Sequence, residues 1–275
     1  MSEHMALENL TVLDLTRVLA GPFCTMMLAD MGANVIKIEV PKGGDDTRSY
    51  PPFRAKNLNG ERESVYFANI NRNKKGITLN LKAPEGKEIF KELVKKADIV
   101  VENYRPGVMD KLGLGYDVLK EINPRIIYAA VSGFGCYGPY HLRPGYDILA
   151  QAMGGMMSIT GSKGGEPTRA GSALGDILGG LHVTIGILAA VNARTITGKG
   201  QRVDVSLMDS MIAATENTAL KYIETGNIPA PMGNRYAAVS PLRQLHLQGA
   251  ARSSSRQATR SCTRSSAMRC WNALI

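Results

Sequence analysis

The chain has 275 residues, of which 44% are hydrophobic, and a formal net charge of +9 at pH 7. That length allows a substantial core and one or two domains. Six arginines lie in residues 242–275, which contain no lysine, aspartate or glutamate, so the first 241 positions hold 27 basic and 24 acidic residues, or +3. This small excess suits an anionic cofactor and argues against a nucleic-acid-binding module.

Short apolar runs alternate with helical patterns along the first 131 residues. In chain order, strands are predicted at residues 11–15, 34–38, 77–81, 99–101 and 126–131. Helices are predicted at residues 22–31, with a proline in the first turn, and at residues 84–96, with one apolar face. This alternation predicts an α/β domain with a Rossmann-like parallel sheet and flanking helices. No GxGxxG motif follows the first strand, so a dinucleotide-dependent dehydrogenase has little support.

Residues 169–191 place one carboxylate, Asp176, between a glycine-rich loop and a nearly all-apolar helix. The helix is predicted from apolar residues at three- and four-residue spacing, which are Leu178, Leu181, Ile185 and Leu188. Aspartate is a favoured N-cap, because its oxygen accepts a backbone N–H of the first turn. The position also suits a nucleophile that the helix dipole keeps ionised. The local sequence leaves both interpretations open.

Membrane, metal and disulfide sites have little support in the sequence. The longest apolar stretch, roughly residues 177–193, is short for a membrane span, and no signal pattern opens the chain. The cysteines lack the paired spacing of a zinc site or disulfide framework; they are Cys24, Cys136, Cys262 and Cys270. We expect a cytoplasmic protein with no metal site and no membrane or nucleic-acid partner.

A series of motifs runs in order from residue 6 to about residue 241. They are LTVLDLTRVLAGP (10–22), LADMGANVIKIE (28–39), GDDTR (44–48), NRNKKG (71–76), VENYRPG (101–107), SGFG (132–135), GKGQRVD (198–204) and GNR (233–235). The series resembles the family III CoA-transferases, which include formyl-CoA transferase and carnitine-metabolism CoA-transferases and to which alpha-methylacyl-CoA racemases are related. The resemblance implies the same Rossmann-like fold and favours Asp176 as the nucleophile over a cap.

The chemistry implied by the resemblance is covalent transfer of CoA. Asp176 attacks the thioester of a donor acyl-CoA to give a mixed anhydride, CoA thiolate converts it to an aspartyl-CoA thioester, and a small carboxylic acid reverses these steps. The resemblance implies coenzyme A contacts from Leu19 and Ala20 near the thiol, and from Tyr146. Around the nucleotide it implies Leu79, Asn80, Leu81, Lys82, Asn103, Tyr104, Arg105 and Lys111. Weaker candidates are Arg48, Arg72 and Lys75.

Three positions bear on specificity and on the competing racemase reaction. Leu19 replaces the glutamine of formyl-CoA transferase, and residues 233–241 have lost most glycines of its protective loop. Formyl-CoA and oxalate are therefore disfavoured as substrates. Tyr146 stands where racemases have histidine, and a tyrosine of ordinary pKa is a poor base, which disfavours racemisation. Its other interpretation is aromatic packing. His182 is interpreted as a core histidine.

The chain is expected to divide into three parts. Residues 1–225 form the N-terminal part of the large domain, and residues 226–241 lead toward a second, small domain that is largely missing. Residues 242–275, rich in Arg and Ser, are expected to be read out of frame and to lack structure. Relatives form interlocked dimers, so a homodimer is expected for the full-length form. An inactive truncated remnant is the alternative to a working transferase.

Overall fold

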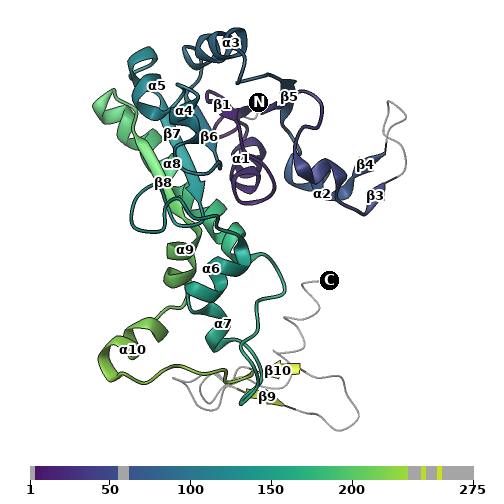
Figure 1. Ribbon diagram of the computed structural model, residues 1–275, viewed down its shortest axis with the longest axis vertical. Helices are drawn as coiled ribbons and strands as arrows, with labels where there is room; N and C mark the ends of the chain where they lie inside the picture. Colours follow the sequence, from purple (N-terminus) through teal and green to yellow (C-terminus); the bar gives the residue numbers. More distant parts are fainter. Residues whose placement is uncertain (1–3, 55–61, 235–242, 246–252, 256–275) are drawn as a thin grey trace.

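A computed structural model describes residues 4–54, 62–234, 243–245 and 253–255. Its centre is a six-stranded sheet in the order β5-β2-β1-β6-β7-β8, in which every neighbouring pair is parallel (Figure 1). The strands are β1 (Thr11–Asp14), β2 (Asn34–Glu39), β5 (Lys75–Thr78), β6 (Ile99–Glu102), β7 (Ile127–Ser132) and β8 (Arg202–Ser206). The predicted α/β fold with a parallel sheet is confirmed.

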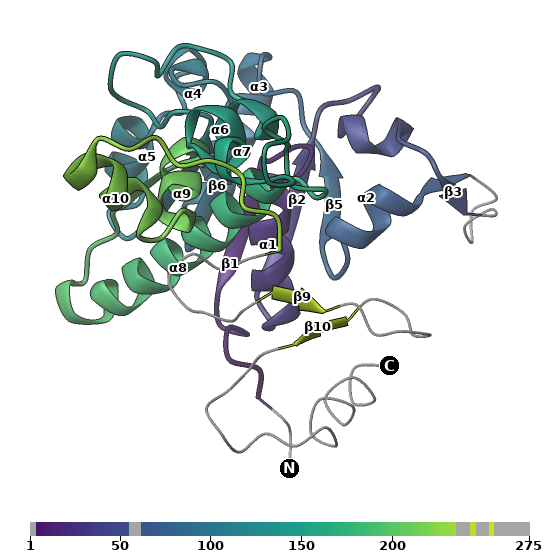
Figure 2. The ribbon, with the colours of Figure 1, turned by 90° about the horizontal axis from the view of Figure 1, so that it is seen from below.

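The central strands β1, β6 and β7 are buried on both faces, because successive side chains point to opposite sides and helices cover both, whereas the edge strand β5 is exposed. Ile99 and Val101 pack in one core with the helices α1 (Ala20–Asp30) and α8 (Leu174–Thr197). Val100 packs in the other with α3 (Pro84–Val94), α4 (Val108–Lys111) and α5 (Tyr116–Ile122). Figure 2 shows these two helical layers on opposite sides of the sheet.

Helix α8 buries only part of its predicted apolar pattern, because Leu178 and Leu188 pack against the core whereas Leu181 and Ile185 do not. Leu181 and Ile185 are 37% and 62% exposed, whereas the buried positions are mainly small or β-branched: Gly175, Gly179, Gly180, Val183, Thr184, Ile187, Ala190 and Arg194. The reason is close approach to α1, since a Cβ on Gly180 would lie 2.7 Å from the carbonyl oxygen of Ala20. His182 is exposed, so its interpretation as a core histidine was wrong.

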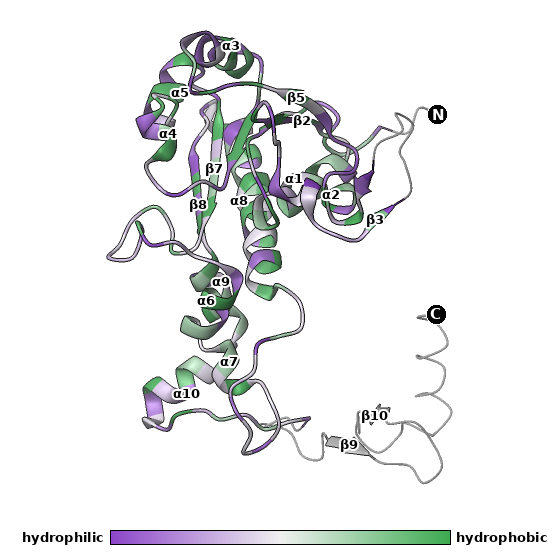
Figure 3. Cartoon of the chain, turned by 45° about the vertical axis from the view of Figure 1, so that its right-hand side comes forward, coloured by the Kyte–Doolittle hydropathy of each residue, from purple (hydrophilic) through white to green (hydrophobic). Residues whose placement is uncertain are grey.

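By length and composition alone, α8 could cross a membrane, and among the described helices no other passes that test. In the structure it contacts α1, α9 (Leu207–Ala214) and the strands β7 and β8. Figure 3 shows hydrophobic residues along α8 and the strand beside it. Apolar surface of the helix therefore packs on the sheet.

The boundary of β5 also differs from prediction, which placed the strand at residues 77–81. The chain leaves the sheet after Thr78, and Leu81 is buried in the core beneath α3. Asn80 shapes the turn, because its side-chain oxygen accepts the N–H of Lys82 at 3.1 Å and its carbonyl accepts the N–H of Ala83 at 3.1 Å. The apolar residues of this segment therefore fill a helix–sheet core.

The remaining elements lie beyond the carboxyl end of the sheet or beside it (Figure 1). The first group is α6 (Asp147–Met153), α7 (Met156–Ile159), α9 and α10 (Thr218–Thr225). The second is η1 (Asp46–Ser49), β3 (Phe53–Arg54), β4 (Glu63–Ser64) and α2 (Val65–Ile70). Within residues 242–275, β9 (Arg243–Leu245) pairs antiparallel with β10 (Ser253–Ser255). The other residues of that segment, and residues 235–241 of the predicted loop, lie outside the described residues.

Candidate functional site

The strand order reverses between β1 and β6. From β1 the chain builds β2 and β5 on one side, and β6, β7 and β8 follow on the other. Loops at such a point leave in opposite directions and open a crevice at the carboxyl edge of the sheet, where open α/β sheets bind ligands. A cavity of about 430 Å³ lies there, bordered by the loops that follow β1 and β6.

Asp176 lines this cavity and does not cap α8. The helix begins at Leu174 with Ala173 in the cap position, without a side-chain capping bond, so Asp176 is the third helical residue. Its carboxylate accepts no hydrogen bond from the part of the chain that the structure describes. Among the described residues, the N-cap interpretation of Asp176 is therefore wrong, and the carboxylate is left available to a ligand.

Burial, and then the negative charge of Asp147, raise the pKa of Asp176 to about 7. The sequence predicted that the helix dipole keeps this carboxylate ionised. The positive end of a helix lowers a carboxyl pKa only modestly, whereas desolvation and a like charge can each raise it by more. The expected full ionisation at neutral pH is thus corrected to a carboxyl group that titrates near neutrality.

Two side chains of α6 hold the loop before Asp176. Asp147 accepts the N–H of Gly175 through Oδ1 and the side-chain amide of Gln151 through Oδ2, both at 2.8 Å. Gln151 is fully buried, accepts the N–H of Ala170 at 2.8 Å and donates to the carbonyl of Ser172 at 3.3 Å. These bonds fix residues 170–175 and so fix where α8, and with it Asp176, begins.

The structure brings seven of the twelve predicted site residues around the cavity: Leu19, Ala20, Asn103, Tyr104, Arg105, Tyr146 and Asp176. Asn103 has its side chain engaged with the protein, because its amide donates to the carbonyl of Arg17 at 2.7 Å and its oxygen accepts the N–H of Arg17 at 2.8 Å. Asn103 therefore shapes the wall of the cavity. Tyr146 is 68% exposed, so aromatic packing does not account for its position.

The other five predicted residues lie outside the cavity lining, namely Leu79, Asn80, Leu81, Lys82 and Lys111. Leu81 is in the core and Asn80 shapes the turn before α3, whereas Lys82 and Lys111 are exposed. The weaker candidates are engaged elsewhere: Arg48 with Glu39, Arg72 with Asp30 and Lys75 with Asn34. The first four residues follow β5, at the same carboxyl edge as the cavity but two strands away from β1.

Sequence reasoning missed five polar residues that line the cavity: Arg17, Asp46, Ser132, Arg143 and Asp147. Arg17 forms an ion pair with Asp46, whereas Arg105 and Arg143 have no ion pair with any described residue. Arg143 lies over the ring of Tyr140, 4.2 Å from its centroid. The position of Arg17 and Ser132 at the carboxyl ends of predicted strands was a signal that could have identified them.

Two buried polar atoms of the cavity residues have no partner within the described residues. They are Oγ of Ser132 and Nε of Arg17. Buried polar groups are normally hydrogen-bonded, so unpaired ones in a cavity wall point to a polar ligand. Tyr66 on α2 is also near the site, since burial and then the charge of Asp176 raise its pKa to about 12. No described group of three His, Cys, Asp or Glu side chains could hold a metal ion.

Comparison with known proteins identifies relatives along most of the chain. It is 47% identical over 235 residues to an acetyl-CoA:oxalate CoA-transferase of Acetobacter aceti, covering 85% of this chain and 59% of the relative. It is 46% identical over 242 residues to a succinyl-CoA:mesaconate CoA-transferase of Haloarcula marismortui, covering 86% and 60%. A crystal structure of a CAIB/BAIF family protein from Brucella suis matches with a TM-score of 0.83 at 43% identity, covering 89% of this chain and 64% of that chain.

The chain thus spans less than two thirds of the length of these curated relatives. The model of CoA-transferase family III matches residues 7–247 and so extends past residue 241 into the arginine-rich segment. The resemblance inferred from the ordered motifs is confirmed. With its parallel sheet and a carboxylate-bearing cavity at the point where the strand order reverses, the chain belongs to CoA-transferase family III.

Proposed function

We propose that this protein transfers CoA from an acyl-CoA to a small carboxylic acid, with Asp176 as the nucleophile. The observation that carries the proposal is a carboxylate without a hydrogen-bond partner among the described residues, in a cavity at the β1–β6 crevice of a family III chain. Such a group is free to attack a bound ligand. A capping or purely structural carboxylate would accept bonds from its surroundings.

The reaction divides one exchange into steps between carboxylates and thiolate. A carboxylate oxygen of Asp176 attacks the thioester carbonyl carbon, the C–S bond breaks, and CoA thiolate leaves an acyl-aspartyl anhydride. The thiolate attacks the Asp176 carbonyl carbon, the anhydride C–O bond breaks, and the donor acid leaves as a carboxylate. An acceptor carboxylate then displaces the thiolate from the aspartyl-CoA thioester. In the last step the thiolate takes the acceptor acyl group, and the Asp176 carboxylate is restored.

The cavity has features that suit an anionic thioester. Leu19 and Ala20 offer an apolar surface for the thiol end, while Arg105 and Arg143 carry cations that no described carboxylate neutralises. Leu79, Asn80, Leu81, Lys82 and Lys111 remain predicted contacts of the nucleotide, outside the cavity lining. We infer a dicarboxylate as the first acceptor class to test, because relatives are named for oxalate, mesaconate and glutarate.

An assay that measures the transfer of CoA from an acyl-CoA to a labelled carboxylic acid tests the proposal. Succinyl-CoA is offered with a panel of dicarboxylates, and Asp176→Ala is expected to reduce exchange at least about a thousandfold, because the covalent route is lost. Asp209→Ala is the matched control, since Asp209 is likewise the third residue of its helix but lies outside the cavity. Mass spectrometry should find CoA attached at Asp176 when acceptor is withheld; undiminished exchange by Asp176→Ala overturns the proposal.

We also propose that the protein acts as a homodimer in the cytoplasm. Large apolar side chains are exposed on two helices, with Ile185 on α8 at 62% and Ile196 at 81%, and Leu220 and Ile223 on α10 at 61% and 71%. Large apolar side chains exposed on a helix are candidates for a surface that another chain covers. This supports self-association through α8 and α10.

A further inference from the structure

Val18, in the wall of the cavity, has a backbone conformation that valine rarely adopts. Its φ angle is 67°, in the left-handed region. A β-branched residue there is a genuine outlier, because its side chain crowds the backbone. Such a conformation persists only where surrounding groups impose it, and it is often found at functional sites. Neighbouring groups must therefore hold Val18 in this conformation.

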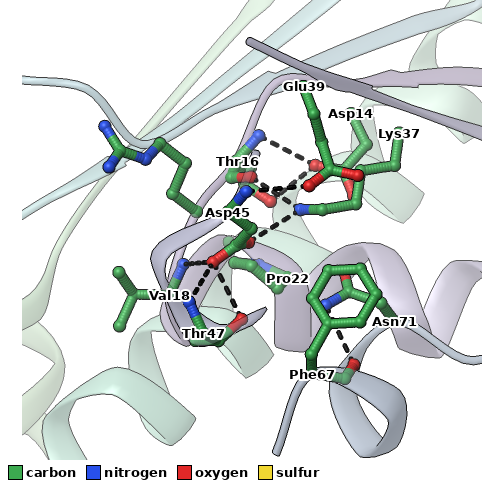
Figure 4. A network of polar contacts seen from close by, with 12 residues as sticks. Asp14, Thr16, Val18, Pro22, Lys37, Glu39, Asp45, Thr47, Phe67 and Asn71 are labelled. Atoms are coloured by element: carbon green, nitrogen blue, oxygen red, sulfur yellow. Dashed lines mark hydrogen bonds and ion pairs between the residues drawn. The ribbon is translucent and has the colours of Figure 1, made fainter. Parts of the chain in front are cut away.

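A buried ion pair spans the turn that contains Val18 (Figure 4). Asp45 accepts the N–H of Val18 through Oδ1 at 3.2 Å, and its Oδ2 contacts the ammonium of Lys37 at 2.9 Å. The same ammonium donates to the carbonyl of Thr16 at 2.9 Å. The pair therefore binds the backbone on both sides of Arg17, at the carbonyl of Thr16 and the N–H of Val18. Lys37 and Asp45 are each 2% exposed, so water cannot substitute for these bonds.

A second buried pair supports the first. Asp14 lies 3.0 Å from the ammonium of Lys74 and accepts the N–H of Thr16 at 2.9 Å. Burial alone would raise the pKa of Asp45, but the charge of Lys37 and bonds from Thr47 hold that pKa below its usual value. Asp45 is thus a carboxylate at neutral pH, able to accept all its bonds at once. Side chains thus bind the N–H and carbonyl groups of Thr16 and Arg17 and the N–H of Val18; they belong to Asp14, Lys37, Asn103 and Asp45.

We propose that Lys37 and Asp45 are positioning residues that hold Val18 in the left-handed conformation and so set the cavity wall formed by residues 17–20 for acyl-CoA. Buried ion pairs contribute little net stability, because desolvation offsets their attraction, so we assign this pair to specifying one local conformation. The choice of acyl-CoA as the ligand rests on the proposed function. The conformational part, the coupling of Asp45 to Val18, can be tested without any ligand.

A double-mutant cycle on the full 275-residue chain tests the coupling. Asp45→Ala is expected to weaken CoA binding, measured by calorimetry, about tenfold, because fewer molecules hold the binding-competent turn. In a Val18→Gly background, the same change should weaken binding less than about twofold, since glycine adopts this φ without support. Equal losses in the two backgrounds overturn the proposal. Hydrogen exchange at the Val18 amide should accelerate in Asp45→Ala.

Controls separate positioning from general stability. Asp98→Asn removes a partly buried pair with Arg194, 3.0 Å long, at the opposite end of the strands, and should lower stability without changing CoA affinity. If Asp45→Ala does not fold, the stabilities of Val18→Gly and Val18→Ala are compared instead. Alanine is the more stabilising residue at most positions, but here Val18→Gly should unfold at the higher urea concentration, because glycine adopts a positive φ without strain. A more stable Val18→Ala contradicts the inference. If the unmodified chain does not bind CoA, the proposed function fails. The coupling of Asp45 to Val18 is then tested by hydrogen exchange at the Val18 amide and by the stabilities of the variants.

Discussion

At the scale of single residues, the environment of Asp176 determines what it can do. The same aspartate on an exposed helix would be ionised at neutral pH and attract cations. Here burial and Asp147 raise its pKa to about 7, so ionisation and nucleophilic reactivity both change within the physiological range. A partly desolvated carboxylate is also less hydrated, which favours its attack on a thioester carbonyl.

The raised pKa predicts a pH-dependent rate. The nucleophile must be ionised, so kcat/KM for CoA exchange is expected to rise through a midpoint near pH 7, the value to which burial and Asp147 raise the Asp176 pKa. Asp147→Asn removes the like charge while keeping an oxygen for Gly175, and should move the midpoint to lower pH. A profile measured between pH 5 and 9 checks this, and a midpoint that Asp147→Asn leaves in place contradicts it.

The same shift predicts a change in stability. A carboxyl group whose folded-state pKa is raised stabilises the fold below its unfolded value, near 3.8, and loses that contribution as pH rises through about 7. Asp176→Asn cannot ionise, so it should match the unmodified chain near pH 4 and exceed it near pH 8. After discounting for partial exposure, we expect a gain of about 1–2 kcal/mol. Urea unfolding at the two pH values measures it, and a gain that is equal at both contradicts the assignment.

At the scale of elements, small residues decide how the helices that carry the site approach one another. Helices α1 and α8 both begin at the cavity, and they cross at Gly180. Gly179 packs on Leu207 of α9, and Gly186 on Val203 of β8, at distances that leave no room for a Cβ. The glycines therefore set the position of α8 relative to the sheet, and with it that of Asp176.

Gly180→Ala tests this packing. The new methyl group would lie 2.7 Å from the carbonyl oxygen of Ala20, so α8 must move away from α1. We expect a loss of about 1–3 kcal/mol in the free energy of unfolding, typical of overpacking, although alanine is the better helix former. Gly76→Ala is the control, because nothing lies within 4 Å of its Cβ position. Stability unchanged by Gly180→Ala would show that the helices are not in close contact.

At the scale of the whole molecule, apolar surface on α8 and α10 remains uncovered. Ile185 on α8 is 62% exposed and Ile223 on α10 is 71% exposed. In Figure 1, α8 lies beside β7 and β8 in the upper half of the ribbon, whereas α10 lies in the lower half. Apolar area exposed to water is unfavourable at about 25 cal/mol per Å², so association that covers it is favoured. An interface that covers the exposed residues of α8 or α10 is therefore expected to be hydrophobic.

Self-association provides the corresponding prediction. Sedimentation velocity is expected to show an average mass that rises with protein concentration, and Ile185→Lys should weaken association about tenfold by placing a charge in the apolar surface. Ile89→Lys is the control, because Ile89 is 51% exposed on α3, on the other face of the sheet. A monomer at all concentrations, or equal effects of the two lysines, contradicts the proposed surface.

The sequence by itself determined the parallel α/β fold, because apolar periodicity is a local property of the chain. Its ordered motifs indicated the family by resemblance, and that resemblance, not the local sequence, made Asp176 the candidate nucleophile. The sequence did not determine which face of α8 is buried, because that depends on which neighbour comes close, and only glycine permits the approach of α1. The tertiary structure likewise decided the pKa of Asp176 and the left-handed conformation of Val18. It also decided the hydrogen bonds by which Asp147 and Gln151 hold the loop before Asp176. Desolvation and charge act through space, between residues that the sequence separates by dozens of positions.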